Sequence, residues 1–529
     1  MRTKLILLIC LLTSINVMAQ RKKKAEPAEP APVKDEIIYH IFQRSFYDSN
    51  GDKHGDLEGI RLKLDYLQDL GVTAILLTPL YDSPFYHNYF ANDFKKIDPW
   101  YGTMQSYLNL VKDLHSRGMK IYLDMETQYV TEDHIWWTDG VDNLKSKYAD
   151  YILYQDSAHS KPSTIIFNLE GLKGYDGTYR KITTVNLNSP KVLEYNYQLF
   201  KYWMDPNGDG KFDDGVDGFR LDHMMDNLDG KAALPHLFNT FWNPLLDRLR
   251  KVNPAISIVA EQANWGSFGE DYLTKGGVDR VFGFRLAFAI RSYDKKQITS
   301  AADSTLALVK DGKQQVVFIE NHDMPRFAYG VKGNLAKLKI AAALNLLLGG
   351  VPSIYYGQEL GMSGTNAKLG ATDANDIPNR EAFEWYKSNE GKGMATWYKE
   401  KGPWKDQFND EKPNDGISLE EERNKPNSLW NFYHEMIVLR RLNPVLINGT
   451  YKTLSNNNDV VYSFQRTQGN TKFVIAVNLS LQSQDVSIQM DAQGGTRLTQ
   501  VRSYANPTIY DNTISLNIPP GAVEVWQLQ

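Results

Sequence analysis

The chain has 529 residues, more than one ordinary hydrophobic core organises, but a barrel of about 250 residues with insertions and one smaller domain would fit. Its formal net charge of −4 gives no reason to expect a nucleic-acid partner, because nucleic acids select strongly basic surfaces. Length and charge therefore favour a large globular protein that acts on something other than DNA or RNA.

Residues 1–19 read as a signal peptide rather than as part of the fold. A basic start precedes an apolar run from Leu5 to Val17, and Val17-Met18-Ala19 resembles a small-residue cleavage site. The run is too short to cross a bilayer as a helix, so we expect an exported protein, periplasmic or secreted, without a transmembrane span. The only cysteine, Cys10, lies in this run, so the mature chain would fold without disulfides. Residues 20–36 combine charge, Pro and Ala without apolar periodicity, which predicts a disordered linker.

Short apolar runs that end in polar residues recur along the chain, with segments of helical spacing between them. We expect strands at residues 37–42, 71–79, 119–124, 216–222, 255–261, 277–283, 315–323 and 351–357. Helical spacing is clearest at residues 108–117, 191–204 and 428–442. Strands that alternate with helices predict a parallel sheet, and eight parallel strands close into a barrel with catalytic groups at the carboxyl ends of the strands. The predicted fold class is therefore α/β, a (β/α)8 TIM barrel formed by residues 37–124 and 181–445.

Other segments do not fit this alternation. Asp124 and Asp217 are separated by about three times the roughly 30 residues of one strand–helix unit, which predicts an inserted B subdomain at residues 125–180, after the third strand. Strands alternate with turns near the end of the chain, so residues 446–529 are expected to form a C-terminal all-β sandwich domain. The long polar segment 363–427 follows the last barrel strand, and we expect it at the rim of the active site.

Two acidic loops carry the pattern of a divalent-cation site. In residues 48–56 oxygen-bearing side chains occupy alternate positions around two glycines, as in the first half of an EF-hand; a polar surface turn is the alternative. Residues 205–214 form a second acidic loop, but Val216 stands where an EF-hand has its twelfth-position Glu. The first loop therefore predicts a structural Ca²⁺ site. The second loop fits a divalent ion and no ion equally well, and both alternatives stay open.

The strand expected at residues 216–222 ends in an arginine and a carboxylate. Arg220 and Asp222 are two residues apart, so their side chains lie on the same face of the strand. A neighbouring guanidinium lowers the pKa of a carboxyl, so we expect Asp222 to be ionised and able to act as a nucleophile. A purely structural Arg–Asp pair is the alternative.

Three of the expected barrel strands end in carboxylates, namely Asp222, Glu261 and Asp323. The carboxyl ends of parallel barrel strands meet at one mouth, so these groups should converge there although they are far apart in sequence. Two carboxyls in different environments can hydrolyse a glycosidic bond, one as an ionised nucleophile and the other as an acid that keeps its proton. A third can bind sugar hydroxyls and stabilise a cationic transition state.

Several motifs occur in the order in which one enzyme family carries them. They are GVTAILLTP at 71–79, Gly102-Thr103, GFRLD at 218–222, Glu261 after an apolar strand, Asn321-His322-Asp323, and GVPSIYYGQELGM at 350–362. In this combination the chain resembles the α-amylase family (glycoside hydrolase family 13) from about Ile37 to the C-terminus. The resemblance implies the same barrel, the inserted domain after the third strand and the C-terminal β-sandwich.

The resemblance also implies roles for single residues. Asp222 would be the nucleophile, Glu261 the general acid/base and Asp323 the stabiliser of the transition state. Substrate contacts are implied for Arg220, which also orients Asp222, for His322, and for Tyr89, which stacks on the sugar ring. The loop at 48–56 is similar to a calcium loop of some members, with the ligands Asp48, Asn50, Asp52, His54 (through its backbone carbonyl) and Asp56. The implied activity is retaining hydrolysis of α-glucosidic bonds in malto-oligosaccharides or starch-type α-glucans.

The chain departs from the family where the third strand ends. The family usually has Asp-x-x-x-Asn-His, and here Asp124 is kept while Gln128 and Tyr129 replace the asparagine and the sugar-binding histidine. We therefore count Asp124 and Tyr129 as candidate substrate-binding residues, and expect the family's interdomain calcium site to be weakened. The segment 184–188 matches neither variant that separates α-1,6-specific from mixed-specificity members, so linkage preference stays open. A transglycosylase of the same family, or a non-catalytic carbohydrate-binding protein, are the alternative functions.

Overall fold

The computed structural model describes residues 35–308, 312–408, 412–490 and 497–529. The expected signal peptide and residues 20–34 of the expected linker lie outside the described residues. The linker prediction is wrong at its end, because Glu36 is buried. Its carboxylate lies 2.7 Å from Lys120 Nζ and also pairs with Arg280, and Tyr122 donates a hydrogen bond to it at 2.6 Å. Residues 35 and 36 therefore belong to the folded unit.

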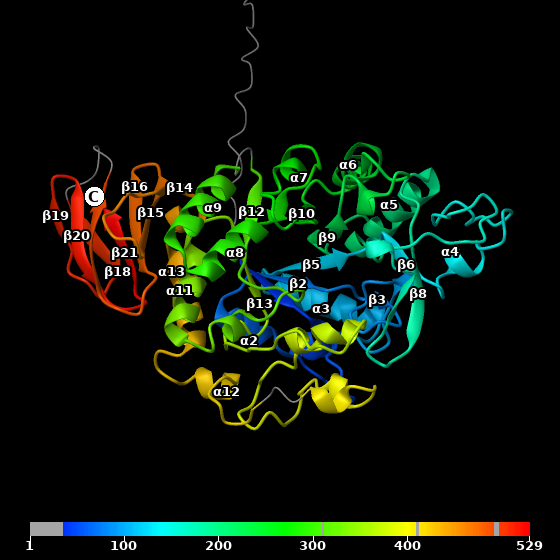
Figure 1. The fold of residues 1–529 in the computed structure, drawn as a ribbon, viewed down its shortest axis with the longest axis horizontal. Coiled ribbons are helices and arrows are strands. Elements are labelled where there is room, and N and C mark those ends of the chain that lie inside the picture. The colour runs from blue at the N-terminus through cyan, green and yellow to red at the C-terminus, as the bar shows by residue number, and fades with distance from the viewer. Residues whose placement is uncertain (1–34, 309–311, 409–411, 491–496) are drawn as a thin grey trace, which may run out of the picture. The chain divides into compact units, whose positions relative to one another are not determined.

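Eight parallel strands close into a barrel, which confirms the predicted fold class (Figure 1). In chain order they are β1 (Ile38–Ile41), β2 (Ala74–Leu77), β5 (Lys120–Met125), β9 (Gly218–Met224), β10 (Ser257–Gln262), β11 (Arg280–Phe282), β12 (Gln314–Val317) and β13 (Val351–Tyr355). Each of these strands overlaps one predicted strand and extends at most two residues beyond the predicted range. β1 pairs with both β2 and β13, so the first and last strands of the barrel close it.

Helices of the barrel unit follow the strands in the expected alternation. Their bounds are α1 (Leu57–Leu62), α2 (Leu64–Leu70), α3 (Met104–Ser116), α5 (Pro190–Met204), α6 (Asn243–Val252), α7 (Glu270–Thr274), α8 (Phe284–Ser292), α9 (Lys295–Ala307), α10 (Phe327–Gly330), α11 (Leu335–Leu347), α12 (Leu419–Glu422), α13 (Leu429–Leu442) and α14 (Pro444–Asn448). The helices predicted from spacing correspond to α3, α5 and α13. Within the described residues, no helix combines the length and apolar character needed to cross a membrane.

The inside of the barrel is apolar in its middle and polar at its mouth. Inward-facing side chains fill the middle, among them Ile38, Leu76, Tyr122, Val259, Phe282 and Val316. Because strand side chains alternate, the next inward residues are two positions further on, and on β1, β5, β9 and β10 these are His40, Asp124, Arg220 and Glu261. The apolar layer therefore forms the floor on which the polar groups rest. Gly218 is required in that floor, since a Cβ there would lie 2.2 Å from the ring of Tyr122.

Strand β12 is shorter than the predicted 315–323. It pairs with β13 through Val316–Val351 and Val317–Pro352. Val317–Pro352 is the last pair between the two strands, and β12 ends at Val317. The segment that holds His322 and Asp323 is therefore a loop beyond the strand end, where β12 leaves the sheet.

Two insertions interrupt the alternation of barrel strands and helices, one after β2 and one after β5. The hairpin β3 (Tyr81–Asp82) and β4 (Asp93–Ile97) precedes α3. After β5 a small sheet forms in the order β6 (Tyr129–Thr131), β8 (Tyr179–Thr184) and β7 (Gly171–Lys173), with α4 (Ile135–Thr138) between them. The boundary predicted at residue 180 falls inside β8, so the insertion extends to Thr184.

The C-terminal region consists of two antiparallel sheets, as the predicted sandwich requires. One has the order β14 (Thr450–Thr453), β15 (Val461–Gln468), β16 (Thr471–Asn478), β21 (Val523–Leu528) and β18 (Leu498–Arg502); the other has the order β17 (Gln484–Gln489), β20 (Thr513–Ile518) and β19 (Thr508–Tyr510). Buried side chains of both sheets, such as Val474 and Trp526 from the first and Ile488 and Ile514 from the second, belong to one apolar cluster.

Candidate active site

Arg220 is the centre of the polar layer, where β9 lies between β5 and β10. Its side chain is 1% exposed, its Nη1 lies 2.6 Å from Asp222 Oδ1, and its Nη2 lies 2.9 Å from Glu261 Oε2. Nη1 also contacts Asp124, the residue that stands opposite Arg220 on β5. One guanidinium therefore gathers carboxyl groups from three adjacent strands, and two of them, Asp222 and Glu261, are predicted catalytic residues.

A β-bulge follows Arg220 at the end of β9. Leu221 pairs with Ala260 and Met224 pairs with Gln262, so two residues of β9, Asp222 and His223, face the single residue Glu261. His223 has a left-handed backbone, with φ of 46°. Its N–H donates to Glu261 Oε2 at 3.3 Å, so the bulge turns a main-chain donor toward the second carboxyl of the site.

The third carboxyl is joined to the others through Tyr89 and His322. The hydroxyl of Tyr89 lies 2.7 Å from Asp124 Oδ2 and 2.7 Å from His322 Nε2, and the two rings are stacked. His322 Nε2 lies 3.1 Å from Asp323 Oδ2. Arg380 holds the other oxygen of that carboxyl, with 3.2 Å between Nη2 and Asp323 Oδ1. The structure thus brings all the predicted catalytic residues into one connected cluster.

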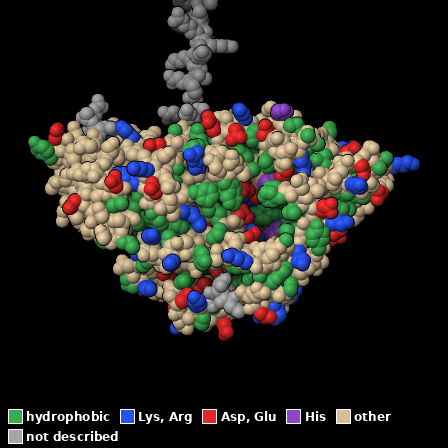
Figure 2. Space-filling view, in the orientation of Figure 1, with side chains coloured by type: hydrophobic (Ala, Val, Ile, Leu, Met, Phe, Trp, Pro, Cys, Tyr) green, Lys and Arg blue, Asp and Glu red, His purple; other side chains and the backbone are tan. Residues whose placement is uncertain are grey.

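Exposure within the cluster increases toward the mouth. The side chain of Asp124 is 0% exposed, that of Glu261 is 9%, that of Asp222 is 15% and that of Asp323 is 30%. Figure 2 shows a recess in this face of the molecule where acidic, histidine and apolar side chains are visible together. Of the three predicted catalytic carboxyls, Asp323 is therefore the most accessible to a ligand and Glu261 the least.

The protonation of Asp222 and Glu261 differs from what Arg220 alone would give. Burial raises the pKa of Asp222 well above its usual range, and Glu261 adds to that rise while Arg220 opposes it. Burial acts in the same direction on Glu261, but the charge of Arg220 and hydrogen bonds with Asp222 and His223 hold the pKa of Glu261 below its usual range. Burial, which the prediction from the Arg220–Asp222 pair left out, therefore acts against the ionised form of Asp222 in the substrate-free site. Asp222 and Glu261 interact closely enough to titrate as a pair.

The remaining groups follow the same physical rule. Burial raises the pKa of Asp124 to about 6, although Arg220 opposes this, and raises the pKa of Asp323 to about 7, although Arg380 opposes this. Burial lowers the pKa of His322 well below its usual range, so this ring is neutral at pH 7. A neutral ring can both donate and accept hydrogen bonds, which suits contacts with sugar hydroxyls.

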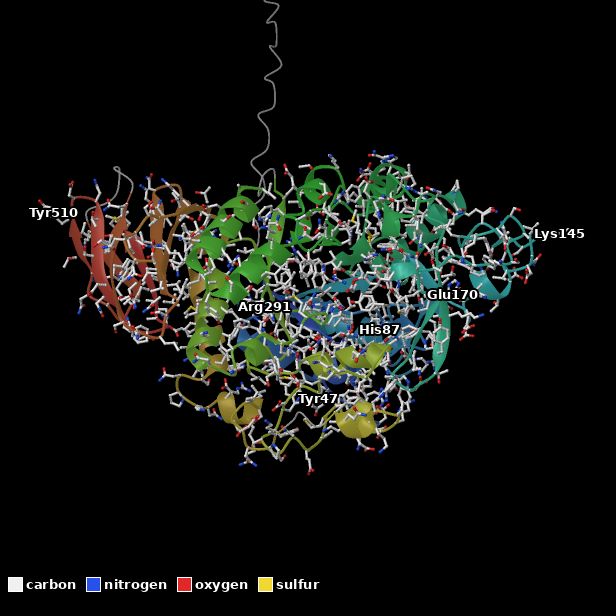
Figure 3. All side chains as sticks on the ribbon, in the orientation of Figure 1. Tyr47, His87, Lys145, Glu170, Arg291 and Tyr510 are labelled. Carbon is white, nitrogen blue, oxygen red and sulfur yellow. The ribbon has the colours of Figure 1, made fainter. Side chains whose placement is uncertain are left out.

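Sequence reasoning missed several residues that hold the site. Arg380 belongs to the 3₁₀ segment Asp373–Arg380 of the long polar segment; its Nε donates to the His322 carbonyl at 2.9 Å and its Nη1 to the Tyr86 hydroxyl at 2.7 Å. Arg291 of α8 donates to the carbonyls of Ile319 and Pro325, on either side of the catalytic loop (Figure 3). No motif in the sequence marks these arginines, since their partners come from other elements. The predicted position of segment 363–427 at the rim is consistent with the contact of Arg380.

His87 is a further missed residue, two positions before Tyr89 (Figure 3). Its ring is buried, its Nε2 lies 3.7 Å from Asp373 Oδ2, and its Nδ1 accepts the N–H of Tyr89 at 3.1 Å. Burial lowers the pKa of His87 well below its usual range. The ring therefore supports the Tyr89 loop as a neutral group. The one signal available in the sequence was the position of His87, two residues before the predicted substrate contact Tyr89.

The geometry agrees with a comparison of sequences. The sequence model of a protein family, described as "Alpha amylase, catalytic domain", matches residues 40–449 of this chain. The chain belongs to the α-amylase family. It is therefore an enzyme that hydrolyses glycosidic bonds, on the barrel that this family uses.

Similar α-amylase family proteins cover most of the chain. "Alpha-amylase 3" of Dictyoglomus thermophilum is 29% identical over 458 residues, which are 84% of this chain and 85% of that protein. "Probable oligo-1,6-glucosidase 3" of Bacillus subtilis is 28% identical over 517 residues, 84% of this chain and 90% of that protein. The solved structure of the α-amylase from H. orenii has 27% identity and a TM-score of 0.78, and it covers 94% of this chain and 100% of its own.

Gln128 and Tyr129, which depart from the α-amylase pattern after β5, both make side-chain hydrogen bonds to the region around β9. Gln128 Nε2 donates to the backbone carbonyls of Asp222 at 2.7 Å and His223 at 3.2 Å. The hydroxyl of Tyr129 donates to Asp229 Oδ2 at 2.7 Å, and Asp229 Oδ1 lies 2.9 Å from His223 Nε2. Gln128 therefore supports the bulge of β9, and Tyr129 is tied to His223 through Asp229. A sugar contact by Tyr129 stays a prediction.

The loop predicted to bind calcium closes on its own backbone. Asp48 accepts the N–H groups of Asn50, Gly51 and Lys53 at 2.7–3.0 Å. The other acidic members do the same: Asp52 accepts from the N–H of His54 and the Asn50 amide, Asp56 accepts from the N–H groups of Ser49 and Gly59, and the His54 ring stacks on Trp100. Across residues 35–308, 312–408, 412–490 and 497–529, no three His, Cys, Asp or Glu side chains gather so that they could hold a metal ion. The donor types of the predicted set, which also includes the Asn50 side chain and the His54 carbonyl, suit Ca²⁺.

The sequence predicts calcium binding at residues 48–56, and the melting temperature of the protein with and without a chelator tests this prediction. An ion that binds only the folded chain stabilises it by mass action, so EDTA should lower the melting temperature and excess Ca²⁺ should restore it. Asp48→Asn should then melt at the lower temperature with or without EDTA. An unchanged melting temperature of the parent protein in EDTA would reject the ion and leave the polar turn seen in the structure.

Proposed function

We propose that this enzyme cleaves α-glucosidic bonds of malto-oligosaccharides or starch-type α-glucans, and that it retains the configuration of the anomeric carbon. The observation that supports retention is that one guanidinium contacts both Asp222 and Glu261, at 2.6 Å and 2.9 Å. Two carboxyls held by one planar group are close together. Retaining enzymes need a separation of about 5 Å, whereas inverting enzymes need about 6.5–9.5 Å to admit a water between them.

The proposed reaction has two steps. Glu261 gives its proton to the glycosidic oxygen as the bond to the anomeric carbon breaks, and Asp222 attacks that carbon to form a glycosyl ester. Glu261, now a carboxylate, takes a proton from water, whose oxygen attacks the same carbon and releases Asp222. In the substrate-free site burial raises the pKa of Asp222 and Arg220 holds the pKa of Glu261 below its usual range, whereas the first step needs the proton on Glu261.

Other residues would bind and stabilise the sugar. Asp323, the most exposed of the three carboxyls, can accept hydrogen bonds from two hydroxyls and face the cationic transition state. Neutral His322 lies beside it and can donate to the same sugar. Tyr89 offers an aromatic face, and its hydroxyl is already fixed by Asp124 and His322. Linkage is left between α-1,4 and α-1,6, and the names of the two relatives, an α-amylase and an oligo-1,6-glucosidase, support both.

The products formed from maltoheptaose, pullulan and isomaltotriose test this proposal. We expect the purified protein to cleave at least one of them, and the first sugar detected by proton NMR to be the α-anomer. Release of the β-anomer would contradict retention. Cleavage of none of the three would contradict the proposed substrate class. Products longer than the substrate at high substrate concentration would show that an acceptor sugar, rather than water, opens the intermediate.

We also propose that the protein is exported, periplasmic or secreted, on the evidence of its N-terminal pattern. Removal of residues 1–19 would leave Gln20 as the first residue. The intact mass of the protein isolated outside the cytoplasm tests this, and a mass that includes Met1 to Ala19 would contradict it.

A further inference from the structure

A second pocket lies outside the catalytic cluster, between the hairpin of β3 and β4, the helix α4 with the loop that follows it, and helix α5. Its volume is about 480 Å³, within the roughly 300–1,000 Å³ that small-ligand pockets occupy. It shares no lining residue with the cluster around Arg220, and the mechanism above uses none of its side chains. Binding in this pocket would therefore leave the catalytic site free.

Three tyrosines form an aromatic wall of the pocket. Tyr195 of α5 and Tyr151 both pack on the buried ring of Trp136, with ring centroids 4.8 Å and 4.9 Å from it. Tyr148, in the loop after α4 where Lys145 is labelled in Figure 3, meets Tyr151 at 5.2 Å with an angle of 85° between the rings. All three tyrosines are half-buried, so packing fixes their rings while part of each stays open. Rings that are fixed before a ligand binds lose little conformational entropy when it does.

The pocket also presents polar groups that can bind a ligand. Asp93 begins β4 and Asp133 precedes α4, and both side chains are exposed and line the pocket. Among the described residues, none hydrogen-bonds the carboxylate of Asp133 or the hydroxyls of Tyr151 and Tyr195. Burial, with smaller contributions from Asp93, Tyr148 and Tyr151, raises the pKa of Tyr195. Its hydroxyl therefore keeps its proton and can both donate and accept a hydrogen bond.

The charges around the pocket distinguish between classes of ligand. A cationic ligand would need free aromatic faces, but Lys147 Nζ already lies 4.7 Å from the centre of the Tyr148 ring, and Lys95 Nζ lies 5.9 Å from that of Tyr195. An anionic ligand would be repelled, because the lining contains two aspartates and only one lysine. A neutral pyranose sugar fits both kinds of wall, since its C–H faces can lie on aromatic rings and its hydroxyls can donate to carboxylates.

We propose that this pocket binds glucosyl units of an α-glucan, with a pyranose ring against Tyr148 and Tyr151 and with sugar hydroxyls on the carboxylates of Asp93 and Asp133. This inference rests on the proposed function, which supplies an α-glucan as the ligand. The pocket attaches the glucan and takes no part in bond cleavage. A glucan long enough to reach both sites is held more tightly than by either site alone, because its second contact is intramolecular.

Binding without turnover tests the inference. In the Asp222→Asn background, retardation in native gels that contain amylopectin measures binding to the intact polymer. Adding Tyr148→Ala should raise the dissociation constant by about fivefold or more, since loss of an aromatic anchor from a binding surface has effects of this size. Asp133→Ala should act in the same direction, because it removes an acceptor that the fold does not use.

Tyr510→Ala is the matched control for these gels. Tyr510 belongs to β19 of the C-terminal sandwich, is 85% exposed and does not line the pocket (Figure 3). Its loss should leave the retardation of the Asp222→Asn protein unchanged. If Tyr510→Ala weakened binding as much as Tyr148→Ala does, the effect would belong to exposed tyrosines in general, and the pocket would lose its specific role.

The kinetic effect should depend on the length of the substrate. Tyr148→Ala in the otherwise unchanged enzyme should raise KM for amylopectin by about three- to tenfold, because the intramolecular second contact is lost. On maltotriose or isomaltotriose, whichever the enzyme cleaves, kcat and kcat/KM should stay within about twofold of the parent. An equal loss of kcat/KM on the short and the long substrate would contradict a site of attachment.

The gels and the kinetics separate this inference from the proposed function. If the parent cleaves no α-glucan but its retardation depends on Tyr148 and Asp133, the proposed function fails and the sugar-binding pocket stands. If the parent is not retarded, or if both variants are retarded as strongly as the parent, the inference fails whatever the activity. Should Tyr148→Ala melt at a lower temperature than the parent, Asp133→Ala alone decides, because its exposed carboxylate supports no other group.

Discussion

Asp222→Asn should lower kcat on an α-glucoside by about 10⁴-fold or more, because an amide cannot form the glycosyl ester and no other carboxyl is placed to replace it in the proposed mechanism. The same variant should melt at the same temperature as the parent or higher. Burial raises the pKa of Asp222 well above its usual range, so an ionised Asp222 costs folding free energy at every pH above its unfolded pKa. Asparagine removes this cost and keeps the shape of the side chain.

Initial rates and thermal melts at pH 7 test both halves of this expectation. Asp209→Asn is the matched control, since the Asp209 carboxylate is 38% exposed and pairs with Lys211 outside the site, so its kcat should stay unchanged. Turnover by Asp222→Asn close to that of the parent would show that Asp222 is not the nucleophile. An inactive variant with a strongly lowered melting temperature would mean that the fold, rather than the chemistry, was lost.

Arg220→Lys should lower kcat/KM by about 10²-fold or more and destabilise the fold. A single ammonium cannot contact Asp124, Asp222 and Glu261 together, whereas the fork of a guanidinium does. Arg220→Met removes the charge as well, and breaking a buried ion pair in this way costs about 3–5 kcal/mol of unfolding free energy. Losing the positive charge also raises the pKa of the carboxyls, so the acidic limb of kcat/KM should move to higher pH.

Urea unfolding and a pH profile measure these effects. Arg248→Lys is the control, because Arg248 pairs with Glu194 at the surface with 34% of its side chain exposed, and surface pairs contribute about 0–1 kcal/mol. If Arg220→Lys matched the parent in stability and kcat/KM, and Arg220→Met matched it in the position of the acidic limb, Arg220 could not be the group that gathers the three carboxyls.

The catalytic carboxyls could be predicted from the sequence because strand ends and motifs mark them. Asp222 and Glu261 end regular strands, and the alternation of side chains put Arg220 on the same face as Asp222. The rise in the pKa of Asp222 could not be predicted, since it depends on burial and on Glu261, which comes from another strand. The Arg220–Asp222 pair gave the right neighbours but did not include these two effects.

The supporting residues show a second limit. Arg380 lies in a polar segment without strand or helix periodicity, so nothing local indicates that it reaches Asp323. Glu36 was assigned to the linker by composition, and its partners Lys120 and Arg280 are visible only in the folded barrel.

The closure of the barrel by its two ends bears on how the protein is made. β1 needs both β2 and β13 to complete its hydrogen bonds, and Asp35, just before it, pairs with Arg440 of α13. A ribosome therefore delivers the first strand long before its last partners exist, and contacts between such distant segments form slowly. During synthesis the barrel stays open at this seam, with one edge of β1 unpaired. The barrel can therefore close only after β13 and α13 have been synthesised.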